Sequence, residues 1–196
     1  ALIAASKRTE GRNAHLIRHR LHLRLEIDNV GVVEDVARHI AAGEVDELSF
    51  MDHTPGQGQY RDLEIWRRSV RSDRELSMED ALEVAKACEE SPKITLDALA
   101  SLASLAREHG VPVASHDDDT VEKLELMQQL GCTISEFPIS LEVAAEARRR
   151  GMSTVMGTPN ILLGKSHSGN LSASEAVRGG VASCLCSDYY PTAMLQ

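Results

Sequence analysis

The sequence predicts an α/β fold in which parallel strands alternate with helices. Short apolar runs alternate with longer segments whose apolar residues recur three and four positions apart, the pattern of helices packed on a sheet. Several short runs are apolar on both faces, as strands are when helices cover a parallel sheet. Gly110, Gly131 and Gly151 each follow a helical segment, where a left-handed glycine ends a helix at low cost. Together these observations indicate a parallel architecture.

Strands and helices are predicted in strict alternation along most of the chain. The predicted strands are Leu21–Ile27, Leu48–Met51, Val111–Ser115, Cys132–Phe137, Ser153–Met156 and Ala182–Cys186. The predicted helices are Val32–Ala42, Met78–Glu90, Leu96–His109, Thr120–Leu130, Leu141–Arg150 and Ala173–Gly179. In Thr120–Leu130, for example, one stripe holds Val121, Leu124, Met127 and Leu130. Such a stripe is expected to pack against the sheet.

The span between Met51 and Val111 interrupts this rhythm. It contains the loop "DHTPGQGQYRD", a charged helix around Leu63–Arg74 and two further helices, and we interpret it as one crossover with an elaborated loop. The sequence has no Ser/Gly linker, repeat or low-complexity tract, so residues 1–196 are assigned to one domain. A length of 196 residues is below the roughly 250 that a typical complete (β/α)₈ barrel needs.

Composition excludes several classes of protein. Hydrophobic residues make up 42% and charged residues 26%, which favours a packed core over disorder. A net charge of −9 argues against a nucleic-acid partner, since phosphate neutralisation needs clustered positive charge. The four cysteines form no CxxC pair, which suits reduced thiols. With no signal peptide or membrane-length apolar run in the sequence, we expect no membrane partner and a cytoplasmic location.

Polar residues stand where the predicted strands end. In chain order they are Glu26, His53, His116, Glu136, Asn160 in the turn "MGTPN", and Asp188. The carboxyl ends of parallel strands meet at one rim, which is where α/β folds carry their chemistry. Carboxylate and imidazole groups converging there can bind a divalent metal and leave positions open for water. A strand-end aspartate is then placed to take a proton from that water.

Taken singly, none of these residues is strong evidence for a metal site. A single histidine is usually a surface residue or a satisfied core residue. In "HDDDT", Asp118 or Asp119 can cap the following helix, and Asp188 can act as a cap or pair with Tyr189. The hypothesis of a metal site therefore depends on the whole set.

A second motif, "GKSHSGNLSASEA", precedes a predicted helix. Its glycines, hydroxyl residues and Asn170 lie near backbone N–H groups that suit a phosphate oxygen, and Lys165 can add a positive charge. The alternative is that this Ser-rich loop is simply a helix cap.

Several motifs, read in order, resemble one family. They are "LHLRLE", "LSFMDHTPGQGQYRD", "VASHDDDTVE", "ISEFPISLEVA", "VMGTPNILLGKSHSGNLSA" and "CSDYYPTAML". The chain resembles the α-D-ribose 1-methylphosphonate 5-triphosphate diphosphatases, amidohydrolase-superfamily enzymes of bacterial carbon–phosphorus lyase pathways. This resemblance implies a TIM-barrel-like (β/α)₈ fold and cleavage of a ribose 5-triphosphate to the 5-phosphate and pyrophosphate. It also implies a phosphorylated sugar or nucleotide-like substrate.

The resemblance assigns roles to individual residues. The implied metal ligands are Glu26, His53, His116 and Glu136, and Asp188 is the implied acceptor of the water proton. The expected cofactor is a divalent metal, with zinc first and manganese or iron as alternatives. Leu163 and Lys165 replace an arginine and a glycine expected in the family. The residues assigned to substrate binding are Gln57, Asp117, Asp118, Asn160, Lys165, Ser166, His167, Ser168, Gly169 and Asn170.

The family's first-strand His-x-His motif is absent before Leu21. We therefore expect an incomplete barrel, holding strands three to eight, that is weak or inactive alone and self-associates as a homo-oligomer. Two other functions stay open. One is a superfamily relative that cleaves a C–N bond, as a deacetylase or deaminase does. The other is a catalytically silent module that binds an anion or a partner chain.

Overall fold

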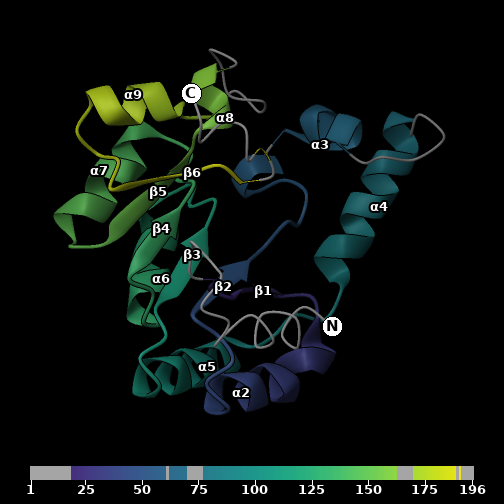
Figure 1. The fold of residues 1–196 in the computed structure, drawn as a ribbon. Coiled ribbons are helices and arrows are strands. Elements are labelled where there is room, and N and C mark those ends of the chain that lie inside the picture. Colours follow the sequence, from purple (N-terminus) through teal and green to yellow (C-terminus); the bar gives the residue numbers. More distant parts are fainter. Residues whose placement is uncertain (1–18, 61, 70–76, 163–169, 189, 191–196) are drawn as a thin grey trace.

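A computed structural model of the protein describes residues 19–60, 62–69, 77–162, 170–188 and 190. These residues contain a six-stranded parallel sheet whose strands lie in chain order (Figure 1). The strands are β1 (His22–Glu26), β2 (Glu47–Met51), β3 (Val113–His116), β4 (Ile134–Glu136), β5 (Ser153–Gly157) and β6 (Cys184–Cys186). The prediction of a parallel α/β fold is confirmed, and each strand falls at its predicted place.

The predicted helices are confirmed as well. They are α2 (Val33–Ala41), α3 (Leu63–Ser69), α4 (Met78–Glu90), α5 (Leu96–Glu108), α6 (Val121–Gln129), α7 (Leu141–Arg149) and α9 (Ala173–Arg178). For the charged helix predicted around Leu63–Arg74, residues 70–74 lie outside the described part. Three short elements are additional: η1 (Val30–Val32), η2 (Gly58–Tyr60) and α8 (Pro159–Leu162). In the described part of the chain, no helix is long and apolar enough to span a bilayer.

Helix boundaries follow local capping chemistry. The side chains of Ser77, Thr95, Thr120, Ser140 and Ser172 each accept a hydrogen bond from a backbone N–H in the first turn of their helix, which satisfies a group that the helix itself leaves unpaired. Thr120, and neither Asp118 nor Asp119, is therefore the cap of α6. The three glycines expected after helices have φ of 70°, 105° and 79°, which confirms their left-handed conformation.

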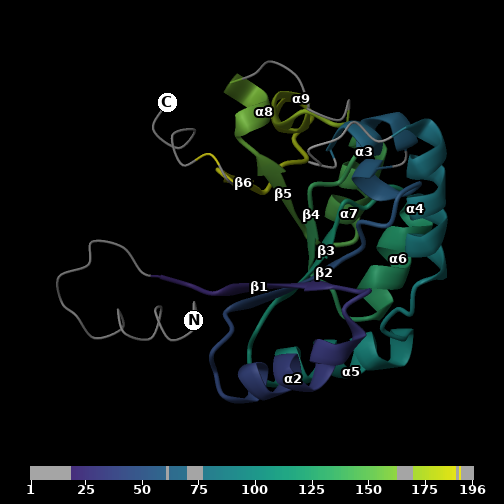
Figure 2. The same ribbon diagram turned by 90° about the vertical axis from the view of Figure 1, so that its right-hand side faces the viewer.

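One face of the sheet packs against helices. Figure 2 shows α2, α5, α6 and α7 gathered along one side of the sheet. Leu25, Leu48, Phe50 and Val113 point into this layer and join the main hydrophobic core with residues of those helices. Phe50 is 2% exposed, and burying such a side chain contributes up to about 3 kcal/mol. The fold is stabilised mainly on this side.

The other face of the sheet is polar. Side chains alternate between faces along a strand, and the register pairs Arg24 with Ser49 and His116 with Glu136. His22, Arg24 and Glu26 therefore lie on the same face as Ser49, His116 and Glu136. Among the described residues, this face carries no helical layer (Figure 2). Ionisable groups are thus collected on one side of the sheet, near the carboxyl ends of its strands.

The connection from β2 to β3 is a single elaborated crossover, as predicted. α5 packs in the main core, whereas α4 stands beside α3 at the edge of the molecule (Figure 1). The buried residue of α4 is Ala81, and Met78, Leu82 and Val84 are exposed. The loop that begins this crossover carries His53 to the rim of the sheet.

Candidate metal centre

Three side chains converge at the carboxyl ends of β2 and β3. Ligand atoms of His53, His116 and Asp117 all lie within 4.8 Å of one another. Asp117 Oδ2 is 2.9 Å from His116 Nδ1 and 3.9 Å from His53 Nε2. His116 ends β3, Asp117 follows it, and His53 lies in the loop after β2. The structure thus brings together two predicted metal ligands, and it adds Asp117, which the resemblance assigned to substrate binding.

The chemistry of these three groups fits a divalent cation. His116 Nδ1 and Asp117 Oδ2 are both buried, and neither has a hydrogen-bond partner. Although they are 2.9 Å apart, the contact lacks the alignment of a hydrogen bond. Buried polar atoms without partners are costly. A cation held by two imidazole nitrogens and a carboxylate oxygen would satisfy them, and this donor set suits zinc and related metals.

Glu26 orients His53. Glu26 Oε1 lies 2.7 Å from His53 Nδ1, so the Nε2 atom is the one that faces Asp117. Burial lowers the pKa of His53, but the hydrogen bond and charge of Glu26 and the charge of Asp117 outweigh it, and the net pKa is raised. The ring of Tyr60 packs edge-on against the imidazole, with centroids 5.8 Å apart. A carboxylate behind a ligating histidine is a common way to fix its orientation.

His116 contacts two other rings and the guanidinium of Arg24. Its ring centroid lies 5.2 Å from that of Phe137 and 5.7 Å from that of His53. Arg24 Nη2 is 3.3 Å from His116 Nε2, so this nitrogen acts as an acceptor for the guanidinium. A neutral imidazole has one lone pair on nitrogen. Binding of a cation at Nδ1 therefore requires Arg24 to release Nε2.

Glu136 and His22 extend the site along the polar face. Glu136 Oε2 lies 3.9 Å from the Nε2 atoms of both His116 and His22, and it has no hydrogen-bond partner. Burial raises the pKa of Glu136 and lowers that of His22. His22 Nε2 also lies 2.9 Å from Ser49 Oγ. Glu136 is thus beside the cluster, outside the group of three, and its role as a ligand stays a prediction.

Three residues that follow strands adopt left-handed backbone conformations. Asp117, Phe137 and Asp188 have φ of 51°, 57° and 48°, which is unfavourable for residues other than glycine. Strained residues of this kind concentrate at functional sites, where surrounding structure maintains them. This independent observation again points to the rim formed by the ends of β3, β4 and β6.

The remaining predicted residues are spread more widely. Asp188 is exposed after β6, and within the described part no ion pair or hydrogen bond links its side chain to the cluster. Gln57 is half-buried in the loop after β2, Asn160 lies in α8 and Asn170 is half-buried before α9. Asp118 is fully buried. The residues that fall outside the described part are Lys165, Ser166, His167, Ser168 and Gly169.

The helix that follows "SHSGN" has a complete capping box. The Ser172 hydroxyl accepts from the Glu175 N–H, and the Glu175 carboxylate accepts from the Ser172 N–H. The expectation of unpaired N–H groups for phosphate is wrong for these two amides, because the box satisfies both and adds a negative charge. The alternative of an ordinary cap is confirmed for Ser172.

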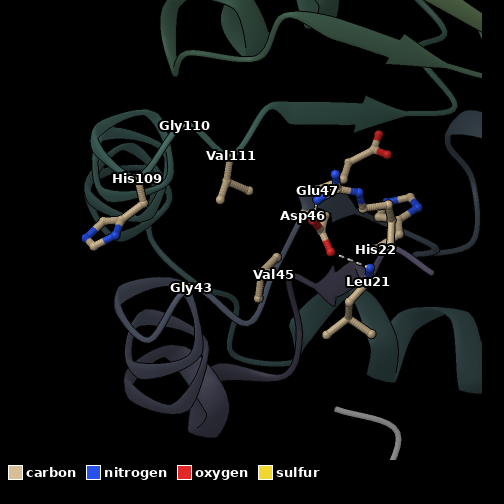
Figure 3. A pocket seen from close by; sticks show the side chains of 10 residues that line it. Leu21, His22, Gly43, Val45, Asp46, Glu47, His109, Gly110 and Val111 are labelled. Atoms are coloured by element: carbon tan, nitrogen blue, oxygen red, sulfur yellow. Dashed lines mark hydrogen bonds and ion pairs between the residues drawn. The ribbon is translucent and has the colours of Figure 1, made fainter. Parts of the chain in front are cut away.

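A cavity of about 520 Å³ opens at the opposite, amino-terminal end of the strands. Figure 3 shows side chains of His22, Asp46 and Glu47 on one side of it and His109 on the other. Asp46 is already paired, with the Arg20 guanidinium and the Leu21 N–H. His53, His116 and Asp117 do not line this cavity, which is therefore separate from the candidate metal centre.

Sequence reasoning missed Arg24, His22 and Ser49 as members of the polar face. A signal was present, because "HLRLE" alternates polar and apolar residues over His22–Glu26, which assigns alternate side chains to opposite faces. The register of the strands is needed to know which face carries the histidines.

Fold and cluster together define a class: a parallel α/β protein with a candidate metal centre at the carboxyl rim of its sheet. Over 99% of its length, the chain is 35% identical to the alpha-D-ribose 1-methylphosphonate 5-triphosphate diphosphatase of Escherichia coli (strain K12). This confirms the resemblance carried by the motifs. The chain spans 52% of the length of that relative.

Other comparisons add little. No protein-family model matches the chain. The N-acetylneuraminic acid synthetase of Leptospira borgpetersenii serovar Hardjo-bovis is 13% identical, with a TM-score of 0.46 over 84% of this chain and 52% of that one. A guanine deaminase from C. acetobutylicum is 12% identical, with a TM-score of 0.35 over 85% of this chain and 52% of that one. Scores this low carry no functional argument.

Proposed function

We propose that this chain forms part of a metal-dependent hydrolase of phosphonate metabolism that converts a ribose 5-triphosphate to the 5-phosphate and pyrophosphate. The observation that carries the proposal is the convergence of His53, His116 and Asp117 in a chain 35% identical to a triphosphate diphosphatase. The unpartnered buried atoms of His116 and Asp117 support a cation at this place.

His53, His116 and Asp117 would hold the cation, with zinc as first choice and manganese or iron as alternatives. When bound, such an ion supplies Lewis acidity toward phosphoryl oxygens and water. Glu26 holds His53 in its binding orientation through the 2.7 Å contact at Nδ1. Asp188, two residues after β6, accepts the proton of the attacking water in this proposal, and the amide of Asn170 contacts the substrate.

Arg24 supplies positive charge for the substrate on the polar face. Its side chain is exposed beside His116, and within the described part of the chain no carboxylate forms an ion pair with it. A guanidinium binds phosphate oxygens through several directed hydrogen bonds. When a triphosphate binds the Arg24 guanidinium, His116 Nε2 no longer has to accept its hydrogen bond. The lone pair can then be on Nδ1, which can bind the cation. Substrate and metal thus favour the same state of His116.

The fold in this proposal is an arc of a TIM-barrel-like (β/α)₈ domain that includes residues 1–196. Sequential parallel strands with helices on one face are what a barrel requires, whereas doubly wound sheets carry helices on both faces. We place the enzyme in the cytoplasm and expect it to self-associate, because edge strands readily pair with other chains. Sedimentation of a clean monomer at high concentration would count against self-association.

The test is hydrolysis of a ribose 5-triphosphate by the enzyme that contains this chain, with added Zn²⁺ or Mn²⁺, followed by ³¹P NMR. We expect pyrophosphate as the product, its loss in His116→Ala, and about a tenfold higher KM in Arg24→Met, since a hydrogen bond to a charged group contributes about 1.5–3 kcal/mol. Acetate release from an N-acetyl sugar in place of pyrophosphate would show that the chain acts on C–N bonds instead.

A further inference from the structure

A buried carboxyl group holds the turn after β3 through hydrogen bonds on the helix-facing side of the sheet. Asp118 is 0% exposed, and its Oδ2 atom accepts hydrogen bonds from Ser115 Oγ at 2.6 Å and Ser135 Oγ at 2.5 Å. These serines belong to the neighbouring strands β3 and β4. One carboxylate oxygen therefore ties together the two strands that deliver His116 and Glu136.

This anchor lies on the side of the sheet opposite the metal centre. The register pairs Ser115 with Phe50, whose side chain lies in the helix-facing core. His116, one residue later, points to the polar face. Since the Asp118 carboxyl contacts Ser115 and Ser135, it is directed into the protein and away from the polar face where a substrate would lie.

A lysine fixes the same turn from α6. Lys123 Nζ donates to the backbone carbonyls of His116 and Asp117, at 3.2 and 3.1 Å. The Asp117 N–H also donates to the Glu136 carbonyl at 2.9 Å. Both sides of the turn are thus held by hydrogen bonds, which explains how Asp117 maintains a φ of 51° that costs energy in isolation.

We propose that Asp118 is a positioning residue for the metal centre: its bonds to Ser115 and Ser135 hold the turn in the conformation that presents His116 Nδ1 and Asp117 Oδ2 to the same cation. This role rests on the metal centre of the proposed function. It differs from the substrate-binding role that the resemblance implies for Asp118. Partners of this kind commonly change metal affinity about 10- to 100-fold.

The test compares Zn²⁺ affinity with stability in a set of variants, by isothermal titration and urea unfolding. Asp118→Ala removes the shared acceptor and is expected to weaken Zn²⁺ binding at least about tenfold. Ser135→Ala removes one donor and is a milder variant in case Asp118→Ala does not fold. Asp118→Asn keeps an oxygen in place and is expected to restore most of the affinity.

Thr154→Val is the matched control. Thr154 is also 0% exposed in the sheet, and its hydroxyl donates to the Val181 carbonyl on the far side of β5. The control should unfold at lower urea and bind Zn²⁺ like the wild type. Equal affinity in Asp118→Ala, Ser135→Ala and wild type would overturn the positioning role alone. A wild-type chain that binds no Zn²⁺ would overturn the metal centre and the positioning role with it.

Discussion

The two faces of the sheet differ in what they do, although the same strands build both. Along β2, Leu48 and Phe50 join the hydrophobic core, while Ser49 between them forms a hydrogen bond with His22 on the polar face. Along β3, Val113 joins the core, whereas His116 belongs to the candidate metal centre. One face stabilises the fold, and the other carries the candidate metal centre and the ionisable groups around it. Neighbouring residues in one strand should therefore respond to substitution in different ways.

The largest expected effect is loss of stability on the core face. Phe50→Ala removes a side chain that is 2% exposed and should lower the free energy of unfolding by about 3–5 kcal/mol, because it leaves a cavity. Ser49→Ala, the adjacent control, loses one hydrogen bond to His22 and should cost about 1 kcal/mol. Urea unfolding measures both. Equal losses would contradict the division between the faces.

A smaller effect is expected from the support of His53. Glu26→Gln replaces the charged partner of His53 Nδ1 and should weaken Zn²⁺ binding about tenfold, with little change in stability. Glu44→Gln is a matched control, because Glu44 Oε2 lies 2.5 Å from His39 Nδ1 in another histidine–carboxylate pair at the end of α2. If both variants bind Zn²⁺ equally well, Glu26 does not orient a ligand.

The smallest effect concerns pH and the carboxylate of Glu146 in α7. Hydrogen bonds from Arg149 and Arg150 lower the pKa of Glu146 to about 2, from an ordinary 4.5. A lowered pKa in the folded state stabilises the fold above the unfolded-state pKa, and this contribution fades as pH falls from about 4.5 to about 2. Glu146→Gln should lie slightly below wild type in stability at pH 7 and converge with it toward pH 2. A constant difference across this range would contradict the assignment.

Local sequence signals were sufficient to predict the strands and most of the helices of the parallel α/β fold. Apolar runs, helical stripes and the glycines after helices are properties of neighbouring residues, so β1 to β6 and most helices fall where they were predicted. The short helix α8 was missed, because "TPNIL" offers one turn without a repeating stripe. The sequence "HDDDT" offers Asp118 and Asp119 as caps of α6, but the cap is Thr120. The Asp118 carboxylate instead accepts hydrogen bonds from two serines in β3 and β4.

The site was predictable in part. His53 and His116 could be found from their place after strands, because parallel strands end at one rim. Asp117 joins them through a left-handed turn, which no local pattern in "SHDDD" specifies. Arg24 and His22 became members of the site through strand register, a long-range property. Asp118 could not be separated from Asp117 by sequence, although the two carboxylates lie on opposite sides of the sheet.

The central claim is that His116 and Asp117 bind a cation and are not needed for the fold. Titration of Zn²⁺ into the wild type, His116→Ala and Asp117→Asn, with urea unfolding of each metal-free protein, tests it directly. The account predicts saturable binding in the wild type, at least about 100-fold weaker binding in both variants, and unfolding midpoints close to wild type. Variants that bind Zn²⁺ as the wild type does, or that lose stability as Phe50→Ala does, would contradict it.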